Sequence, residues 1–471
     1  MSSQYQLSGA SANEIAASVE RGVASGALAP GDALPSVRAL AAELAVSPTT
    51  VAAALRDLRR RGVVVSRPRS GTRIAERPPL RLRGAPVAPP GARDLASGSP
   101  DPAFLPDLAA ALRDLDAPHR LYGEPPVLEE LAAVVARDVA APGHAARSPD
   151  DRAAPGHAAR SRDDLAAPGH PARSPDEVAP RGDAARICVV NGALDGIERV
   201  LAAHLSPGDA VVVEDPGWPG VIDLVRALGL RVIGARVDAR GMLPEELARA
   251  LRAGARAVVL TPRGQNPFGA AHDAARAAEL RAVLTEDVLL VEDDHLGPVA
   301  GVDWLSASGS TARFATVQSV SKWLGPDLRL AIVTGDELTL ARVEGRQSLG
   351  PGWVSAISQR LTARLWSSTD VTRPREAYIE RREAMLAALA ALGVEAHGAS
   401  GLNVWVPVPD EDAVVRALLA AGYSISAGAG FRLSTPPAVR ITTATVKPGD
   451  APAIAGALAA AVSPPRRTRA A

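Results

Sequence analysis

Lys322 carries a functional group that almost no other residue of this chain offers. The sequence has 52 lysine and arginine residues, and only Lys322 and Lys447 are lysines. An amine condenses with an aldehyde to give a Schiff base, whereas a guanidinium does not. Lys447 stands beside Pro448 near the C-terminus and is expected to be a solvated surface charge. Lys322 therefore indicates amine chemistry.

Phosphate-binding groups surround this lysine. Ser319 and Ser321 precede it, and Arg329 follows it in the run Gly-Pro-Asp-Leu-Arg. Farther upstream, Asn191-Gly192-Ala193 follows an apolar strand and opens a helix, where backbone N–H groups meet anions. Hydroxyls, a guanidinium and a helix N-terminus together favour a phosphorylated aldehyde cofactor.

Three further side chains stand at the ends of predicted strands. Asp293 follows Val288–Glu292 and can keep a ring nitrogen protonated, although such an acid also caps helices. Trp218 can stack on a flat ring, with core packing as the alternative. Asn266 can bond a phenolic oxygen, although Asn-Pro is also a common turn dipeptide. Together with Lys322 they predict a site for a pyridine cofactor.

These residues must be positioned by alternating strands and helices. Apolar strands are predicted at Ala210–Val213, Ala257–Leu260, Val288–Val291 and Ala331–Val333, with amphipathic helices at Val221–Leu228 and Asp273–Leu284. This alternation is typical of an α/β domain with a parallel, helix-covered sheet.

The N-terminal region has a different pattern. One helix is predicted over residues 11–25, a second over 37–44 with Ser36 as its N-cap, and a third that begins with Ser47 and Pro48. Two short strands then flank a basic tip at residues 67–71, which predicts a hairpin. The order indicates an α+β winged helix-turn-helix.

Charge supports a nucleic-acid partner for this region. The whole chain has a formal net charge of +0. Residues 56–83, however, contain ten arginines against Asp57 and Glu76, which concentrates positive charge near the predicted wing.

The remaining segments lack periodic patterns. Residues 77–93 predict a linker, and residues 464–471 a frayed tail. Ala-Pro-Gly-His recurs at a 13-residue period within 141–182, which favours a low-complexity insertion over a metal site despite its histidines. The single cysteine, Cys188, excludes an internal disulfide. With no signal segment or long apolar run, a cytoplasmic protein is expected.

The chain resembles a known fusion of two families. Residues 94–462 resemble the fold type I aminotransferases, and the N-terminal region resembles GntR-type regulators. Val190–Glu198, Glu292–His295 and Ser319–Lys322 are the segments most similar to MocR-type transcription factors, especially their vitamin B6-related, PtsJ/PdxR-like branch. The expected domains are a winged helix at 8–76, a linker at 77–93, and an aminotransferase-like domain at 94–463 with a smaller C-terminal subdomain.

The resemblance implies that pyridoxal 5′-phosphate is held on Lys322 as an internal aldimine. Asp293 would pair with the ring nitrogen, Asn266 would contact the ring hydroxyl, and Trp218 would lie against the ring. His295 stands where many relatives carry a tyrosine that bonds the cofactor oxygen. The phosphate would be surrounded by Gly192, Ala193, Leu194, Ser319, Ser321 and Arg329.

Two residues are implied to serve other partners. Tyr122 matches a residue that reaches the phosphate of the neighbouring subunit, which implies a homodimer. Arg440 stands where such proteins hold a substrate or effector carboxylate.

The resemblance also implies contacts with double-stranded DNA. Pro48 and Ala52 stand where some relatives place base-reading arginines. Wing insertion and contacts with the DNA backbone are therefore expected to contribute more to DNA binding than direct base readout. The residues expected to contact DNA are Arg38, Ser47, Thr49, Thr50, Arg67, Arg69 and Gly71.

Three functions follow as hypotheses. The leading one is a transcription regulator whose DNA binding responds to pyridoxal 5′-phosphate or an amino compound, with control of vitamin B6 or amino-acid metabolism genes. The second is a working aminotransferase with an accessory DNA-binding domain. The third is a dimerisation scaffold without cofactor.

Overall fold

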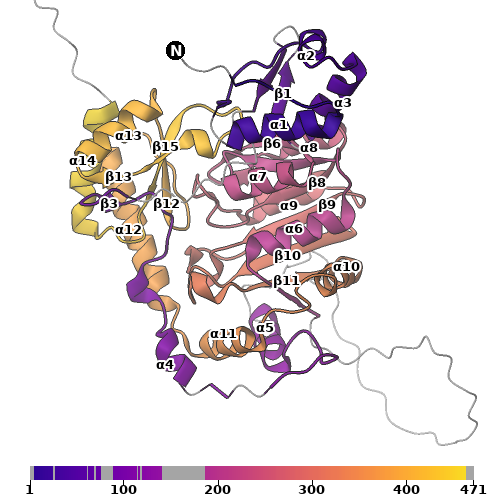
Figure 1. Ribbon diagram of the computed structural model, residues 1–471. Helices are drawn as coiled ribbons and strands as arrows, with labels where there is room; N and C mark the ends of the chain where they lie inside the picture. Colours follow the sequence, from indigo (N-terminus) through magenta and orange to yellow (C-terminus); the bar gives the residue numbers. More distant parts are fainter. Residues whose placement is uncertain are drawn as a thin grey trace, which may run out of the picture.

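The computed structural model describes residues 5–24, 27–60, 62–67, 71–75, 88–113, 115–116, 119–140 and 186–462. The predicted insertion and tail, and the predicted linker up to residue 87, lie outside this part of the chain. Figure 1 shows an N-terminal unit above a helix-covered sheet, with a smaller C-terminal unit beside the sheet. No helix of the described residues is long and apolar enough to cross a membrane.

The N-terminal unit has the predicted helix-turn-helix and wing. Its elements are α1 (Ala12–Ala24), α2 (Val37–Glu43), α3 (Pro48–Arg60), β1 (Val64–Arg67) and β2 (Gly71–Ile74). β1 and β2 form an antiparallel pair, and the helices enclose their own apolar core.

Side-chain caps fix where the second and third helices begin. The Ser36 hydroxyl accepts the N–H of Ala39 at 3.2 Å, and the Ser47 hydroxyl accepts the N–H of Thr50 at 3.1 Å. Each cap satisfies a backbone donor that the first helical turn leaves without an intrahelical acceptor. Both predicted caps are confirmed.

A sheet of eight strands forms the centre of the large unit. The strand order is β4-β11-β10-β9-β8-β5-β6-β7. The strands are β4 (Cys188–Val190), β5 (Ala210–Asp215), β6 (Arg231–Asp238), β7 (Gly241–Met242), β8 (Ala255–Leu260), β9 (Leu289–Asp294), β10 (Arg313–Ser319) and β11 (Ala331–Gly335).

The prediction of a parallel sheet is correct for its centre and wrong for Ala331–Val333. β6, β5, β8, β9 and β10 run parallel to their neighbours in that series. β11 runs antiparallel to both β10 and β4. The segment between β10 and β11, residues 320–330, is shorter than a usual parallel crossover, so the chain turns back. The segment that contains Lys322 is therefore a tight connection at one end of the sheet.

Helices cover both faces of this sheet. Alternating residues of β5 point to opposite faces: Val211 and Val213 pack in the core with α6, α7 and α10, whereas Ala210 and Val212 pack in the core with α8 and α9. The helices are α6 (Ala193–His204), α7 (Pro219–Ala227), α8 (Pro244–Arg252), α9 (Ala274–Val283) and α10 (Glu337–Ser348).

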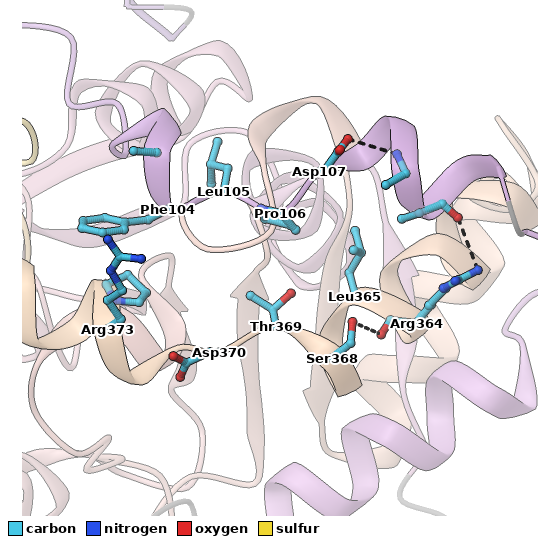
Figure 2. Close-up of a pocket in the computed structure, with 14 residues that line it drawn as sticks. Phe104, Leu105, Pro106, Asp107, Arg364, Leu365, Ser368, Thr369, Asp370 and Arg373 are labelled. Atoms are coloured by element: carbon cyan, nitrogen blue, oxygen red, sulfur yellow. Dashed lines mark hydrogen bonds between the residues drawn. The ribbon is translucent and has the colours of Figure 1, made fainter.

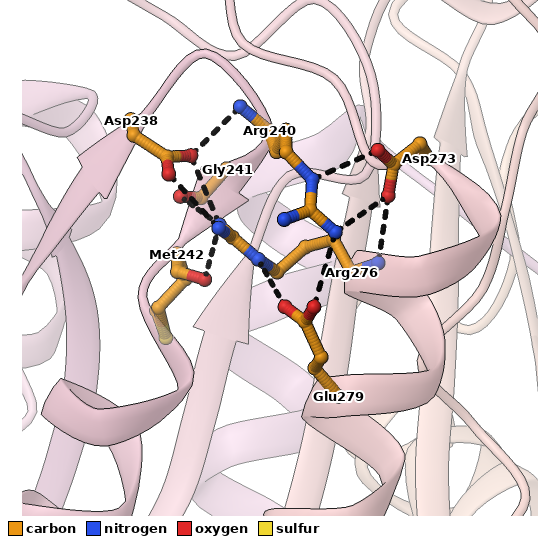
Figure 3. A network of polar contacts seen from close by, with 7 residues as sticks. All are labelled: Asp238, Arg240, Gly241, Met242, Asp273, Arg276 and Glu279. Atoms are coloured by element: carbon orange, nitrogen blue, oxygen red, sulfur yellow. Dashed lines mark hydrogen bonds and ion pairs between the residues drawn. The ribbon is translucent and has the colours of Figure 1, made fainter.

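A network of charged side chains attaches α9 to the turn between β6 and β7 (Figure 3). Arg276 is 3% exposed and donates to both carboxylate oxygens of Asp238, at 3.0 and 2.9 Å, and to the Gly241 carbonyl at 2.9 Å. Arg240 forms a two-bond contact with Asp273, the N-cap of α9. These contacts involve no predicted site residue and stabilise the edge of the sheet.

The smaller C-terminal unit packs helices against a three-stranded sheet of order β12-β15-β14. The two-residue strand β3 (Arg93–Asp94), which begins at the last residue of the predicted linker, pairs in parallel with β13 of this unit. The linker therefore enters the small unit before the chain reaches the large one. The elements are α12 (Thr372–Ala391), β12 (Asn403–Pro407), α13 (Glu411–Ala420), β13 (Tyr423–Ser424), β14 (Ser426–Ala427), β15 (Ala438–Thr442) and α14 (Ala451–Val462).

Three more helices lie at the foot of the large unit in Figure 1: α4 (Leu108–Arg113), α5 (Glu129–Ala140) and α11 (Ala356–Ser368). They share an apolar core with Trp323 and Leu324, which directly follow Lys322. This packing fixes the backbone on the C-terminal side of the lysine.

Candidate functional site

The parallel strands bring the predicted cofactor residues to one edge of the sheet. Asp293 stands at the end of β9, and Trp218, Asn266 and Lys322 follow β5, β8 and β10. The carboxyl ends of neighbouring parallel strands meet at the same edge, where open α/β sheets bind ligands. The structure thus unites four side chains that span more than one hundred positions of the sequence.

Lys322 lies in a partly buried position. Its Nζ donates a hydrogen bond to the carbonyl oxygen of Gly98 at 2.7 Å. Burial, followed by the nearby positive charge of Arg440, lowers the pKa of Lys322 from 10.5 to about 8. A larger share of the amine is then neutral near physiological pH, as nucleophilic attack on an aldehyde requires.

Asp293 has the unmet bonding capacity that a protonated ring nitrogen would satisfy. The residue is 3% exposed, and its Oδ1 has no hydrogen-bond partner among the described residues. Burial raises the pKa of Asp293 to about 8, and the carboxylates of Asp294 and Glu214 add to the shift. Buried carboxyl oxygens are seldom left unbonded, and Asp293 lines a small cavity together with Trp218.

His295 supplies a neutral imidazole beside these groups. Its Nδ1 lies 3.8 Å from Oδ2 of Asp293, which is beyond hydrogen-bond distance. Burial lowers the pKa of His295 to about 4, with the charge of Lys322 as the next contribution. An uncharged ring in this position can face an aromatic cofactor without adding positive charge.

An anion-binding arrangement lies at the N-terminus of α6. Gly192 is the N-cap residue with φ of 90°, and a Cβ there would lie 2.7 Å from Nη2 of Arg329. Ala193 and Leu194, the first residues of α6, have N–H groups without an intrahelical acceptor. The guanidinium and the helix end therefore meet at one point, where a phosphate is favoured.

The two predicted hydroxyls lie close to each other in the connection after β10. Ser319 Oγ and Ser321 Oγ are 2.9 Å apart, and Ser319 Oγ also accepts the N–H of Ser321 at 3.2 Å. Their mutual contact holds the backbone immediately before Lys322 in a defined conformation.

Arg440 is a further cationic group of the site, in addition to Lys322 and Arg329. The residue is 5% exposed, and its Nη1 donates to Oδ1 of Asn266 at 3.0 Å. Its Nη2 donates to the hydroxyl of Ser426 at 3.2 Å and to the carbonyl of Ala96. Burial lowers the pKa of Arg440 to about 10, which leaves the guanidinium charged at neutral pH. A buried cation of this kind is suited to a carboxylate.

Tyr122 is not brought to the site within one chain. Its side chain is 93% exposed, and its ring packs edge-on against Trp353 with centroids 5.6 Å apart. The role implied for Tyr122 concerns a neighbouring subunit, so a single chain does not test it.

The structure describes five of the seven predicted DNA contacts in full. Arg38 on α2 and Thr49 at the start of α3 are exposed. The hydroxyls of Ser47 and Thr50 lie 2.8 Å apart, and Ser47 also caps α3 by accepting the N–H of Thr50. Gly71 begins β2 with φ of 73°, a value that favours glycine. The side chain of Arg67 and the whole of Arg69 lie outside the described residues.

Sequence reasoning missed a buried carboxyl group next to Asp293. Glu214 accepts hydrogen bonds from the N–H and hydroxyl of Thr261 at 3.1 and 3.0 Å, and from the amide of Gln265 at 3.1 Å. Burial raises the pKa of Glu214 to about 7. Glu214 could have been identified from the sequence, because it stands at the end of an apolar strand, as Asp293 does.

A cavity of about 500 Å³ lies elsewhere, between the segment that precedes α4 and the ends of α11 and α12 (Figure 2). Phe104 lies on one wall, with the guanidinium of Arg373 5.7 Å from its ring centroid. None of the predicted cofactor residues lines this cavity.

The chain matches two protein families. Residues 144–458 match the family model of aminotransferase class I and II, a pyridoxal-phosphate-dependent family, and residues 11–74 match that of bacterial regulatory proteins of the gntR family.

Curated relatives have the same two parts. The vitamin B6 salvage pathway transcriptional repressor PtsJ of Salmonella typhimurium is 36% identical over 93% of this chain and 96% of its own length. The transcriptional regulator TauR of Rhodobacter capsulatus is 27% identical over 88% of each chain.

Solved structures share the fold of the large unit. An archaeal alanine:glyoxylate aminotransferase superposes with a TM-score of 0.64 at 20% identity, over 79% of this chain and 90% of its own. The α-aminoadipate aminotransferase LysN of Thermus thermophilus, complexed with N-(5′-phosphopyridoxyl)-L-leucine, gives a TM-score of 0.63 at 20% identity, over 79% and 92%. From these matches, the chain belongs to the MocR-type family of DNA-binding transcription regulators, in which a GntR-type domain is fused to an aminotransferase-like domain.

Proposed function

We propose that this regulator binds pyridoxal 5′-phosphate covalently through Lys322 and that cofactor occupancy changes its affinity for operator DNA. The observation that carries the proposal is the unpartnered Oδ1 of Asp293, which is buried at the same sheet edge as the Lys322 amine. An acceptor without a donor and an amine with a lowered pKa are what a pyridine aldehyde needs at its two ends.

The residues fit the cofactor as follows. Asp293 would hold the proton on the ring nitrogen, Asn266 would face the ring hydroxyl, and Trp218 would support one ring face. Neutral His295 would stand near the ring. When bound, the cofactor supplies an electron-withdrawing ring for an attached amine. The phosphate would be held by Gly192, Ala193, Leu194, Ser319, Ser321 and Arg329.

The effector class follows from Arg440. This buried guanidinium, bonded to Asn266, would hold the carboxylate of an amino acid whose amine reaches the cofactor. Vitamin B6 salvage genes are the proposed target because the relative PtsJ bears that function in its name. The protein would then act where its DNA is, in the cytoplasm.

A homodimer is the proposed working form. Leu121 and Leu349 are 70% and 91% exposed, and Tyr122 lies next to Leu121 with 93% of its side chain exposed. Large exposed apolar side chains of this kind favour coverage by another protein surface. A second copy that covered them would bring Tyr122 toward the partner's phosphate site.

An active aminotransferase remains the second candidate. The observation in its favour is that the Lys322 amine, the buried Asp293 carboxyl and the buried Arg440 guanidinium all lie around one site, although His295 stands in place of the tyrosine that many relatives carry.

Two measurements test these proposals: the first tests the attachment residue, and the second distinguishes the regulator from the aminotransferase. Reduction of the cofactor-loaded protein with borohydride, followed by peptide mapping, should place the pyridoxyl group on Lys322, and Lys322→Ala should remove the visible absorbance while the fold persists. Attachment at another residue would refute the assignment. Sustained turnover of an amino donor and a keto acid would support the aminotransferase instead.

A further inference from the structure

A short segment crosses the candidate cofactor site on its way from the small unit to the large one. Residues 94–101 form this segment, here named the strap. At its start, the N–H of Leu95 donates to the Ser424 carbonyl at 2.8 Å, and the carbonyl of Leu95 accepts the N–H of Thr442 at 2.8 Å. At its end, the N–H of Asp101 donates to the Tyr378 hydroxyl at 3.0 Å. The strap is thus anchored at both ends.

The middle of the strap contacts two cationic groups of the site, Lys322 and Arg440. The Gly98 carbonyl accepts the hydrogen bond from Lys322 Nζ at 2.7 Å, and the Ala96 carbonyl accepts one from Arg440 Nη2. Ser426 Oγ donates to the same Ala96 carbonyl at 2.9 Å. A Cβ on Gly98 would lie 3.5 Å from each terminal nitrogen of Arg440, so the strap backbone lies directly against that guanidinium.

The two carbonyls use the same donor groups that the proposed ligands would use. Condensation of Lys322 with an aldehyde forms a C=N bond and releases the aldehyde oxygen as water, which leaves at most one N–H on a nitrogen that otherwise has three donors. A carboxylate that bonds Arg440 competes with the Ala96 carbonyl and makes the stronger, charge-assisted contact.

We propose that the strap is an internal ligand of the cofactor-free protein, that its bond from Lys322 to Gly98 holds the small unit against the large unit, and that the strap is displaced in two steps. Cofactor attachment frees the Gly98 carbonyl from Lys322, and an effector carboxylate then frees the Ala96 carbonyl from Arg440. This inference rests on the proposed function, since both displacing ligands belong to the site proposed above.

The strap lies next in the chain to the linker that leads to the DNA-binding unit, so release of the strap can affect the position of that unit. Asp94 belongs to β3 and directly follows the predicted linker. Its Oδ1 accepts hydrogen bonds from the N–H groups of Ala96 and Ser97 at 2.8 and 3.0 Å. Arg93 ties the same strand to Asp450 of the small unit at 2.8 Å. A shift of the strap and the small unit therefore moves the attachment point of the linker.

Hydrogen exchange of the peptide that covers residues 94–101 tests the proposal in the full-length protein. Lys322→Arg keeps a cationic donor but cannot form the Schiff base, whereas Lys322→Met has similar size and no donor. Without cofactor, the strap in K322M should exchange about tenfold faster than in K322R, because a hydrogen bond from a charged donor is lost. In the wild-type protein, the strap should exchange at about the K322R rate without cofactor, and its exchange rate should rise toward that of K322M when pyridoxal 5′-phosphate is added. Peptides of α9 should exchange equally in all samples.

A second variant guards against misfolding at the lysine. Ser426→Ala removes one donor to the Ala96 carbonyl, leaves Lys322 in place, and should raise strap exchange severalfold without cofactor. Equal strap exchange in K322M and K322R, with no effect of S426A, would overturn the proposal. Faster strap exchange on cofactor addition with unchanged DNA affinity would uphold the strap and refute the proposed function.

Discussion

Gly192→Ala is the substitution whose effects follow most directly from the geometry of the phosphate site. Gly192 has φ of 90° and ψ of 170°, a region open essentially to glycine alone. Alanine there is expected to cost about 1–3 kcal/mol of folding free energy. The new Cβ would also lie 2.7 Å from Nη2 of Arg329, so that guanidinium must move.

The displaced guanidinium sets the size of the binding effect. The contact involves the end of a flexible side chain, so Arg329 rather than the backbone is expected to shift. The loss of one charged hydrogen bond to a phosphate costs about 1.5–3 kcal/mol. At about 1.4 kcal/mol per factor of ten, affinity for pyridoxal 5′-phosphate should fall roughly 10- to 150-fold.

Titration followed by absorbance should be performed with pyridoxal 5′-phosphate and with pyridoxal, which lacks the phosphate. Gly208→Ala is the matched control, because Gly208 has φ of 100° and nothing lies within 4 Å of the position of its Cβ. Both variants should lose stability, but only G192A should weaken the phosphorylated ligand selectively. Equal weakening of both ligands in G192A, or unchanged affinity for the phosphorylated one, would refute the assignment of Gly192 and Arg329 to the phosphate.

Three other outcomes are expected. The rate of cofactor attachment should rise with pH and level off above about pH 8, where Lys322 with its lowered pKa becomes neutral; a stopped-flow series that still rises steeply toward pH 10 would contradict this. Arg263→Met should lower the free energy of unfolding in urea by about 3–5 kcal/mol, because the buried Asp294 loses the two hydrogen bonds from Arg263. The double variant R263M/D294L should recover most of this loss, and a double variant as unstable as R263M would contradict the reasoning. Arg38→Ala should weaken DNA binding and lower the salt slope in anisotropy titrations by about one; an unchanged slope would remove Arg38 from the phosphate contacts.

The sequence was sufficient to predict the residues with distinctive chemistry. Lys322 stood out because lysine is scarce, and Asp293, Asn266 and Trp218 because each follows an apolar strand. The structure places all four at one sheet edge. Ser36 and Ser47 were predicted as helix caps from local pattern alone, since a cap depends on residues only three positions away.

Contacts between distant parts of the chain could not be predicted in this way. The bond between Lys322 and Gly98 joins residues 224 positions apart and uses a backbone carbonyl, which every residue has. The predicted parallel direction of β11 was wrong, because an apolar run predicts a strand but not its direction relative to the neighbouring strand. The roles of individual cofactor and DNA residues, and the proposed domain boundaries, stay predictions.

The central claim is that attachment of the cofactor to Lys322 changes DNA binding. The most direct test is the anisotropy of a labelled fragment from upstream of the gene, with wild-type protein and increasing pyridoxal 5′-phosphate, while absorbance reports attachment in the same samples. The account predicts that DNA affinity changes in parallel with attachment and that K322R shows no change. Full attachment at constant DNA affinity would contradict it.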